Sequence, residues 1–462
     1  MRDFLPPDVR RREYVVGVIK QVYEHYGFEP LETPAIENIE TLLGKYGEEG
    51  NQLIFKILKR GVHESTGEAD LALRYDLTVP LARVVAEYRD KLPKFFKRYQ
   101  IQPVWRADRP ARGRFREFYQ CDVDVLGSRS MLVEAELCGA ASEALTRLGI
   151  DDFIIRLNHR QALRGVLEAA GVSLAKHETA LIALDKLDKI GRDGVCKELS
   201  DRGISDESGE DLLDFFGELN SLERPAEIVT RGESDTNEAL NAAILGRMVE
   251  FVNDNDCGVK GIEELRLIVK FSAAAGFANR IKVDPSLVRG LSYYTGAIME
   301  ISVKDLAGSL GGGGRYDNLV GMFLDQDVPA CGFSLGMERI IVMMSERELF
   351  PAATVSAPAD LMVSIWDEDS AADSISLARD LRKAGFRVDL YPDVDKLGKQ
   401  LKYASSRGIP FVAILGDDER LAGKVSLKDL LSGDQRTLTR EAIAQELHRA
   451  IAARQAECLK DR

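Results

Sequence analysis

The feature that most constrains this chain is an arginine-rich loop that leads directly into a strand with strict alternation. The loop carries five arginines around a proline and a glycine: Arg106, Arg109, Arg112, Arg114 and Arg116. The strand expected over Phe115–Leu126 has a mostly polar face, formed by Phe118, Gln120, Asp122 and Asp124. Because arginine is a permanently charged, planar fork, this segment predicts the floor of a site that holds a cation beside a phosphate. The alternative is an exposed, solvated hairpin on an antiparallel sheet.

The length of 462 residues exceeds one ordinary core, so two or three domains are expected. No segment approaches the uncharged apolar run of about 18 residues that a membrane span needs. The N-terminus also lacks a secretory signal pattern, so we expect a cytoplasmic protein with no membrane partner. The six cysteines form no Cys-x-x-Cys pair and the five histidines show no metal-ligand spacing, so no protein ligand to a metal is predicted.

The charge of the chain is unevenly distributed. A net charge of −13 argues on average against a polyanionic partner. Between Arg89 and Arg116, however, ten basic residues stand against two acidic ones, whereas Asp201 to Asp256 is strongly acidic. An anion could therefore bind locally despite the overall sign.

The order of expected elements indicates an α+β fold dominated by antiparallel strands. Further strands are expected at Gln52–Leu58, Ala72–Tyr75, Phe95–Trp105 and Leu287–Val303. Residues 177–256 are acidic and helix-rich without strand alternation, which indicates an inserted helical module. Small residues and prolines at Pro351–Pro358 indicate a linker, and alternating strands and helices after it predict a small parallel α/β unit over 358–462.

An ordered series of motifs resembles the histidyl-tRNA synthetases, a family of class II aminoacyl-tRNA synthetases, over nearly the whole chain. The segments that carry the resemblance are Arg2–Pro6, Gly27–Pro34, Leu73–Pro80, Val104–Leu126, Leu287–Gly296, Gly313–Val320 and Gly332–Arg339. The resemblance implies an antiparallel-sheet catalytic domain in two parts, 1–176 and 257–350. It also implies a helical insertion domain at 177–256 and an anticodon-binding α/β domain at 358–462.

The activity implied by the resemblance is ATP-dependent ligation of L-histidine to tRNA(His) through a histidyl-adenylate, with release of AMP and pyrophosphate. The family is homodimeric, and Mg²⁺ would bridge the phosphates of ATP. No general base is required, because the attacking carboxylate is already ionised. Catalysis would then rest on positioning and electrostatics.

The resemblance also implies roles for individual residues. Arg106 would contact the α-phosphate of ATP, with Arg289 at a second α-phosphate position, while Asp108 would face the adenosine and Arg339 the γ-phosphate. The residues implied around the substrate histidine are Asp76, Thr78, Gln120, Asp124, Arg289, Tyr293 and Tyr294. This set fits the substrate, because an α-ammonium needs carboxylate and hydroxyl acceptors and an imidazole is best read by a carboxylate or phenol.

Two positions depart from the family pattern. Ser292 stands where the family usually has aspartate, which reduces the negative charge beside Arg289. Asp124 stands where many members have glutamate, which keeps the acceptor but shortens its reach. The sequence leaves open the role of the acidic insertion and the division of roles among Arg109, Arg112, Arg114 and Arg116.

Two alternative functions compete with this interpretation. A regulatory paralogue that binds histidine without charging tRNA can share the fold. Such paralogues typically lack the anticodon domain and the ATP motifs, whereas both are present here. A nucleotide-binding dehydrogenase is a weaker alternative, because Gly311–Gly314 does not supply the G-x-G-x-x-G fingerprint between a strand and a helix.

Overall fold

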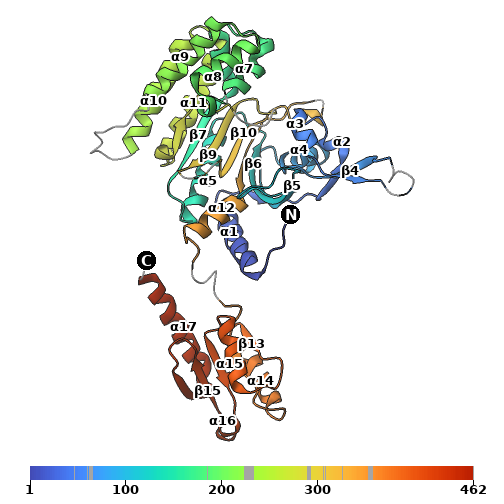
Figure 1. Ribbon diagram of the computed structural model, residues 1–462, viewed down its shortest axis with the longest axis vertical. Coiled ribbons are helices and arrows are strands. Elements are labelled where there is room, and N and C mark those ends of the chain that lie inside the picture. Colours follow the sequence, from blue (N-terminus) through green and yellow to red (C-terminus); the bar gives the residue numbers. More distant parts are fainter. Residues whose placement is uncertain are drawn as a thin grey trace. The chain divides into compact units, whose positions relative to one another are not determined.

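The computed structural model describes residues 1–45, 47–59, 61, 66–184, 186–222, 234–288, 293–304, 306, 308–324, 326–351 and 357–460. The chain divides into two compact units, Met1–Leu349 and Phe350–Arg462. Figure 1 shows the elements of each unit. Among the described residues, no helix combines the length and the apolar character needed to cross a membrane.

An eight-stranded sheet forms the centre of the first unit, in the order β1-β5-β6-β11-β10-β9-β7-β8. Its strands are β1 (Glu29–Pro30), β5 (Phe96–Trp105), β6 (Glu117–Leu126), β7 (Phe153–His159), β8 (Ile281–Val283), β9 (Ala297–Val303), β10 (Gly311–Arg315) and β11 (Ala330–Gly336). All neighbours from β5 to β7 are antiparallel, and only the outer pairs β1·β5 and β7·β8 are parallel. The predicted antiparallel-rich sheet is therefore confirmed.

Helices cover the apolar face of this sheet. The helices concerned are α1 (Pro6–His25), α5 (Leu132–Arg147) and α12 (Met337–Glu346). Cys138 of α5 contacts Met299 of β9 through their sulfur atoms at 3.3 Å, and the Tyr23 hydroxyl of α1 donates to the carbonyl of Cys121 at 3.1 Å. Cys121 and Val123 are fully buried, and Asp122 and Asp124 line a cavity on the polar face, which agrees with period-two alternation along β6.

A small sheet stands beside the large one, in the order β2-β4-β3. Its elements are β2 (Ile36–Asn38), α2 (Ile39–Leu42), α3 (Gly47–Gln52), β3 (Lys56–Leu58), β4 (Ala69–Leu73) and α4 (Thr78–Glu87). The strand expected at Gln52–Leu58 starts later, because Gln52 ends a helix. The strand expected at Ala72–Tyr75 ends at Leu73, and α4 begins at Thr78, where Asp76 accepts a hydrogen bond from the Val79 N–H at 3.0 Å.

Helices dominate the segment between β7 and β8. They are α6 (Arg160–Ala169), α7 (His177–Leu184), α8 (Leu187–Asp201), α9 (Asp206–Leu222), α10 (Ser234–Val252) and α11 (Asp256–Ala274). The rings of Phe215 and Phe251 stack at 4.3 Å between α9 and α10. Gly165 and Gly258 allow α6 and α11 to cross closely, since a Cβ on either would meet the other helix. Met1–Leu349 forms one compact unit, so the domain boundaries at 177 and 256 stay predictions.

The second unit is a five-stranded sheet in the order β13-β12-β14-β15-β16 with helices on both faces. Its elements are β12 (Leu361–Val363), α14 (Ala371–Lys383), β13 (Val388–Leu390), α15 (Leu397–Ser406), β14 (Phe411–Ile414), α16 (Asp417–Ala422), β15 (Lys424–Asp429), β16 (Gln435–Thr439) and α17 (Ala442–Lys460). Leu361 packs with α14 and α17, whereas Met362 packs with α15.

The parallel arrangement predicted for this unit is confirmed for its three predicted strands, and the sheet has two further strands that were not predicted. β12, β13 and β14 are parallel, but β15 and β16 run antiparallel. The reason lies in the short helix α16, which ends at Gly423 with a left-handed φ of 64°. The chain therefore reverses direction after β14 without a crossover helix.

Candidate active site

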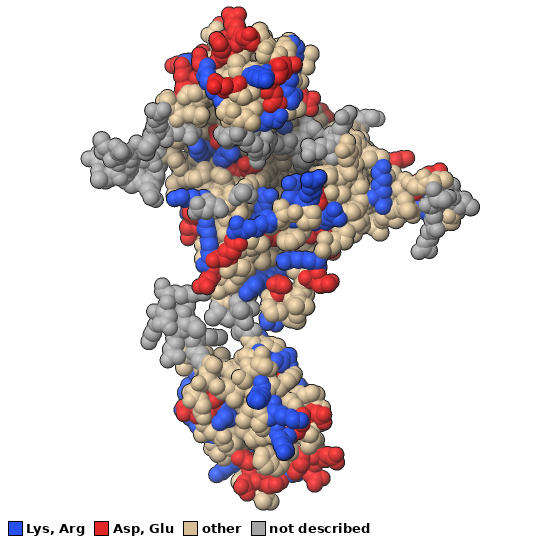
Figure 2. Space-filling view, in the orientation of Figure 1, with Lys and Arg blue, Asp and Glu red and all other residues tan. Residues whose placement is uncertain are grey.

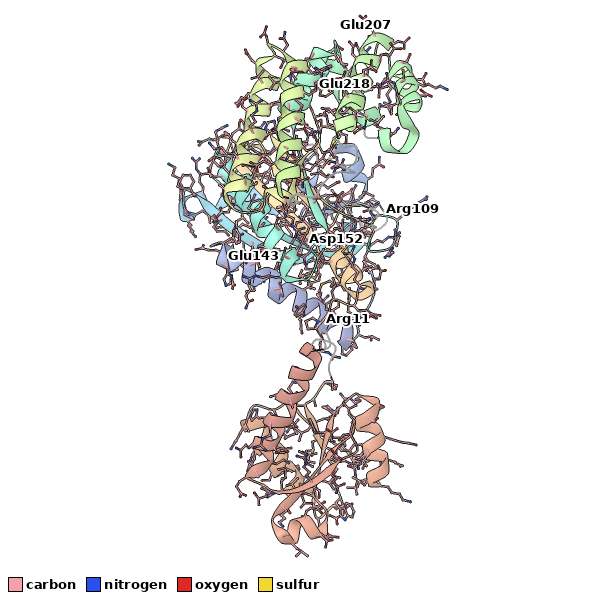
Figure 3. The ribbon with its side chains drawn as sticks, turned by 90° about the vertical axis from the view of Figure 1, so that its left-hand side faces the viewer. Arg11, Arg109, Glu143, Asp152, Glu207 and Glu218 are labelled. Carbon is pink, nitrogen blue, oxygen red and sulfur yellow. The ribbon has the colours of Figure 1, made fainter. Side chains whose placement is uncertain are left out.

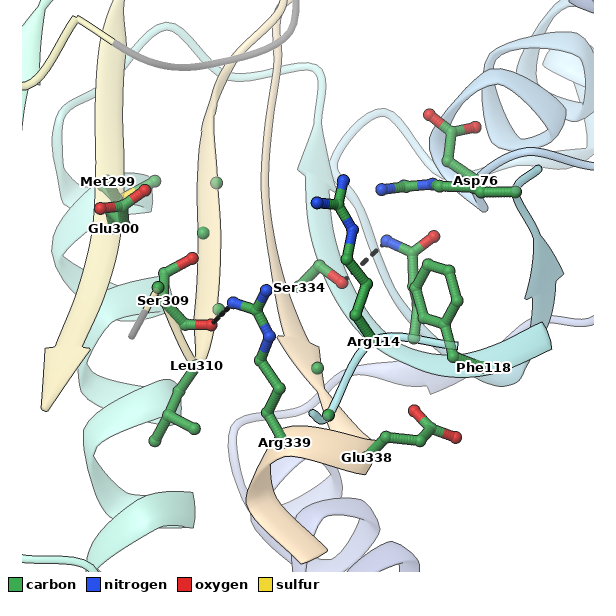
Figure 4. Close-up of a pocket in the computed structure, with 18 of the residues that line it drawn as sticks. Asp76, Arg114, Phe118, Met299, Glu300, Ser309, Leu310, Ser334, Glu338 and Arg339 are labelled. Carbon is green, nitrogen blue, oxygen red and sulfur yellow. Dashed lines mark hydrogen bonds between the residues drawn. The ribbon is translucent and has the colours of Figure 1, made fainter. Parts of the chain in front are cut away.

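A pocket of about 460 Å³ lies on the polar face of the large sheet, where β6, β9, β10 and β11 meet α12 and the arginine-rich loop (Figure 4). Eight of the ten predicted side chains line it: Asp76, Thr78, Arg106, Asp108, Gln120, Tyr293, Tyr294 and Arg339. Asp124 lines a smaller adjoining cavity. Arg289 lies outside the described residues, as does Ser292. The exposed-hairpin alternative is excluded, because the polar face of β6 is the floor of this pocket.

The glycine tract forms part of the same floor. Gly311–Arg315 is the antiparallel strand β10, paired with β9 and β11, and does not connect a strand to a helix. Gly311, Gly312 and Gly313 line the pocket with their backbones. The absence of side chains there lets a ligand approach the sheet closely, and the strand geometry excludes a dinucleotide-binding turn.

Arg106 is held in place at one end of the pocket. Its Nε donates to the carbonyl of Tyr75 at 3.1 Å. Its guanidinium lies over the rings of Tyr75 and Phe118, at 4.3 and 5.1 Å from the ring centroids. A stacked and tethered guanidinium is oriented before any ligand binds, which suits it to contact a phosphate.

The remaining loop arginines separate into different environments. Arg114 lines the pocket and pairs with Asp108 at 3.0 Å, and Arg116 donates through Nε to the Asp108 carbonyl at 3.2 Å. Arg112 instead pairs with Glu346 on α12, and Arg109 is exposed (Figure 3). Asp108 thus lies in the pocket wall, and of these four arginines only Arg114 lines the pocket.

Arg339 enters the pocket from α12, where it donates to the carbonyl of Ser309 (Figure 4). Burial lowers the pKa of Arg339, and the positive charge of Arg114 lowers it further. Two guanidiniums that repel each other across a pocket favour an anion between them.

Glu338 was not predicted as a pocket residue. Its side chain is 4 % exposed, and both carboxylate oxygens accept from the Tyr119 backbone N–H, at 3.0 and 3.1 Å. Burial raises its pKa to about 7. Glu338 is the one acidic residue of the motif Gly332–Arg339, and nothing in that sequence indicated that its carboxylate is desolvated.

Aromatic and carboxylate groups form the other end of the pocket. The Tyr293 hydroxyl donates to Asp76 at 3.3 Å. The ring of Tyr293 meets those of Tyr294 and Tyr316 edge-on, at 5.2 and 5.9 Å. Gln120 donates through Nε2 to the Ser334 hydroxyl at 3.0 Å. This end presents acceptors within an aromatic enclosure, as an ammonium or an imidazole requires.

Asp124 lies deeper, in a cavity of about 20 Å³ that it shares with Asp122, Tyr294 and Tyr316. Asp124 is 2 % exposed, its Oδ2 lies 2.7 Å from the guanidinium of Arg98, and the Tyr316 hydroxyl donates to its Oδ1. Tyr316, Asp122 and Arg98 were not among the predicted site residues. Tyr316 belongs to a motif named above and Asp122 to the polar strand face, so both carried a signal.

The distribution of charged side chains on the surface agrees with the uneven distribution of charge along the sequence. On the face shown in Figure 2, Lys and Arg side chains gather over the sheet of the first unit, and acidic side chains are frequent over the helical segment that includes α9. Among the described residues, no group of three or more His, Cys, Asp or Glu is placed to hold a metal ion.

Comparison with known proteins gives consistent results for both units. Residues 1–340 match the family described as histidyl-tRNA synthetase, and residues 360–449 match the anticodon binding domain. The histidine–tRNA ligases of Bacteroides fragilis and Porphyromonas gingivalis are 42% and 43% identical, and each alignment covers 96% of both chains.

Solved structures show the same fold. The histidyl-tRNA synthetase of Nostoc sp. PCC 7120 is 32% identical, covers 97% of each chain and superposes with a TM-score of 0.79. A structure from Bacillus halodurans, described as an ATP phosphoribosyltransferase regulatory subunit/histidyl-tRNA synthetase, has a TM-score of 0.68 but is 21% identical, so its likeness concerns the fold alone.

Proposed function

This chain belongs to the histidyl-tRNA synthetase family, and we infer that it attaches L-histidine to tRNA(His) with ATP, through a histidyl-adenylate. The observation that carries the site assignment is the division of one pocket into a cationic end and an acceptor-rich aromatic end. These two ends match the two substrates of the first step, since ATP is a polyanion and histidine carries an α-ammonium and an imidazole.

At the cationic end, Arg106 would bind the α-phosphate, while Arg339, with Arg114 beside it, would bind the terminal phosphates. The histidine carboxylate attacks the α-phosphorus, a P–O bond forms, and pyrophosphate leaves with the electrons of the broken bond. Negative charge grows on the α-phosphate oxygens during this step. The stacked guanidinium of Arg106 stabilises it without reorganisation. Asp108 would lie on the adenosine side.

At the aromatic end, Asp76 and Thr78 would accept from the α-ammonium of histidine. Tyr293 supports this arrangement, because its hydroxyl already donates to Asp76. Gln120, Tyr294 and Asp124 would then surround the imidazole. This orientation directs the histidine carboxylate toward Arg106, which brings the two reacting atoms together.

Arg289 would supply the second cation at the α-phosphate. Leu287, two residues before it, lines the pocket, which supports this role. We expect Arg289→Ala to abolish adenylate formation and to leave the fold largely intact. Ser292, three residues later, would leave that arginine with less negative charge beside it than is usual in the family.

Mg²⁺ would enter with ATP, as part of the substrate. The described residues provide no cluster of ligands for it, so no protein group is assigned to the ion. Its chemistry would be the neutralisation of phosphate charge.

The second unit would bind the anticodon of tRNA(His), and the match of residues 360–449 to the anticodon binding domain supports this. We further propose that the protein acts as a homodimer in the cytoplasm, as the family does. The division of the chain into a catalytic domain (1–176 and 257–350), a helical insertion (177–256) and an anticodon-binding domain (358–462) is proposed on the same grounds.

A histidine-binding regulatory protein is the rival function, and two observations disfavour it. Arg106 and Arg339 both line the pocket, although a protein that only binds histidine has no need of them. The second unit is also present, with its own sheet and core. The near-full-length relatives at 42% and 43% identity carry the name of the ligase.

Exchange of radiolabelled pyrophosphate into ATP, measured with each of the twenty amino acids, tests the first step. We expect exchange with histidine alone. Binding of histidine by folded protein without any exchange would support the regulatory alternative and contradict the ligase.

A further inference from the structure

The mechanism proposed above assigns no role to Asp122, a buried carboxylate. It is 2 % exposed and lines the small cavity beside Asp124, Thr78 and Tyr294. Its Oδ1 is buried and makes no hydrogen bond with any described residue. A buried carboxylate oxygen without a donor is costly, so an unpartnered oxygen on a residue that lines a cavity beside the substrate pocket points to a donor on the ligand.

The charges around this cavity do not balance. Arg98 is fully buried, with its Nη2 at 2.7 Å from Asp124 and its Nη1 donating to Gln100 at 3.2 Å. Arg98 therefore compensates one carboxylate of the two. The charged and titratable groups that interact with Asp122 and Asp124 are Tyr23, Arg74, Asp76, Arg98, Cys121, Tyr294, Tyr316 and Cys331.

We propose that Asp122 is a specificity-determining residue that, together with Asp124, selects the side chain of histidine in its imidazolium form. With both ring nitrogens protonated, the imidazolium donates one N–H to each carboxylate. Two carboxylates, one guanidinium and one imidazolium then sum to zero, which is the condition for stable burial of charge. This inference rests on the proposed function, because it deepens the recognition of the same substrate.

The proton that this arrangement needs has a source within the site. Burial raises the pKa of Asp122 to about 7, against the opposing effect of Arg98. Near neutral pH the empty site therefore holds a proton on Asp122 for part of the time. When a neutral imidazole binds, the Asp122 O–H bond breaks and a ring N–H bond forms, with no other reactant. At about pH 8.5 both Asp122 and free imidazole are deprotonated, so binding must take one proton from solvent.

Calorimetric titration of the full-length protein with L-histidine tests this step directly. Measured at about pH 8.5 in two buffers of different ionisation enthalpy, histidine binding should take up about one proton per site. Binding of 1,2,4-triazole-3-alanine, whose ring is far less basic, should be weaker and take up none. Histidine binding without proton uptake would overturn the proposal.

The substitution Asp122→Asn tests whether Asp122 is responsible for the proton uptake and for the preference for histidine. We expect proton uptake to disappear and the ratio of kcat/KM for histidine over triazole-alanine, in pyrophosphate exchange, to fall at least about tenfold. Asp152→Asn is the matched control, because Asp152 forms an exposed ion pair with Arg347 at 2.6 Å and should leave both values unchanged.

Asp122→Ser replaces this variant if the asparagine protein does not fold. A variant that binds ATP normally but no longer binds histidine also supports the role. An Asp122 variant with wild-type uptake and ratio refutes it and leaves the proposed function standing. Absence of exchange in the wild-type protein refutes the proposed function itself.

Discussion

Gly332 lies directly opposite Asp124 in the neighbouring strand. Strands β11 and β6 pair these two residues, and a methyl group added to Gly332 would overlap the Oδ1 atom of Asp124. The carboxylate occupies the space that a side chain at position 332 would fill. Glycine at position 332 is therefore required for the contacts that Asp124 makes with Arg98 and Tyr316.

Gly332→Ala should displace the Asp124 carboxylate and weaken histidine binding about 10- to 100-fold, as expected when hydrogen bonds to a charged group are lost. Calorimetric titration with histidine measures this, and ATP binding should change little. Gly17→Ala is the control, because Gly17 lies on the exposed side of α1 and a methyl group there would meet no heavy atom within 4 Å. Equal histidine affinities in the two variants would contradict the role of Gly332.

Arg106 and Arg112 lie six residues apart in one loop, and we expect their substitution to have very different effects on the rate of adenylate formation. Arg106→Ala should lower kcat for histidine-dependent exchange about 100- to 1000-fold, because the oriented cation at the α-phosphate is lost. Arg112→Ala should leave kcat within about twofold, since Arg112 forms an exposed ion pair with Glu346. Similar losses in both variants would mean that the loop acts through its overall charge.

Glu338 should make stability depend on pH. Burial raises its pKa to about 7 from the ordinary 4.5. Because the folded-state value is the higher one, the stability linked to this group is fully present below pH 4.5 and is lost as the pH rises through 7. At 1.36 kcal/mol per pKa unit, wild type should lose about 3 kcal/mol relative to Glu338→Gln across this range.

Urea unfolding measures this difference. The chain has two tryptophans, and Trp366→Phe in all proteins leaves Trp105 to report on the first unit. Glu346→Gln, on the exposed end of the same helix, should follow wild type at every pH. If wild type and Glu338→Gln differ by the same amount at pH 5 and pH 8, Glu338 does not titrate as described.

Removal of the second unit should separate the two steps of the reaction. Truncation after Leu349 leaves the pocket complete, because every residue that lines it belongs to the first unit. Exchange with histidine should persist within about threefold, whereas tRNA charging should fall about 100-fold when one of two linked binding modules is lost. Exchange and charging rates, measured on the same preparation, give the comparison. An equal loss of the exchange rate and the charging rate would contradict the assignment of the first step to the first unit alone.

Much of the site could be predicted from sequence, because its chemistry lies within short motifs. Period-two alternation in β6 correctly grouped Gln120, Asp122 and Asp124 on one face, and the structure places all three along the pocket and its adjoining cavity. The arginine-rich loop likewise pointed to an anion. Local patterns of this kind need no knowledge of the fold.

The partners of these residues could not be predicted, because they depend on strand register and on distant contacts. Arg98 meets Asp124 only because β5 and β6 pair in a register that places them opposite each other. Arg112 and Glu346 are 234 positions apart. The antiparallel strands β15 and β16 were missed for a similar reason, since a reversal at Gly423 decides their direction.

The charging of tRNA tests the central claim most directly. Full-length protein is incubated with ATP, Mg²⁺, total tRNA and each radiolabelled amino acid in turn, and acid-precipitable label is counted. The structure and the family predict charging with histidine alone, abolished by Arg106→Ala and retained by Arg112→Ala. Folded protein that binds histidine and ATP but charges no tRNA with histidine would contradict the account.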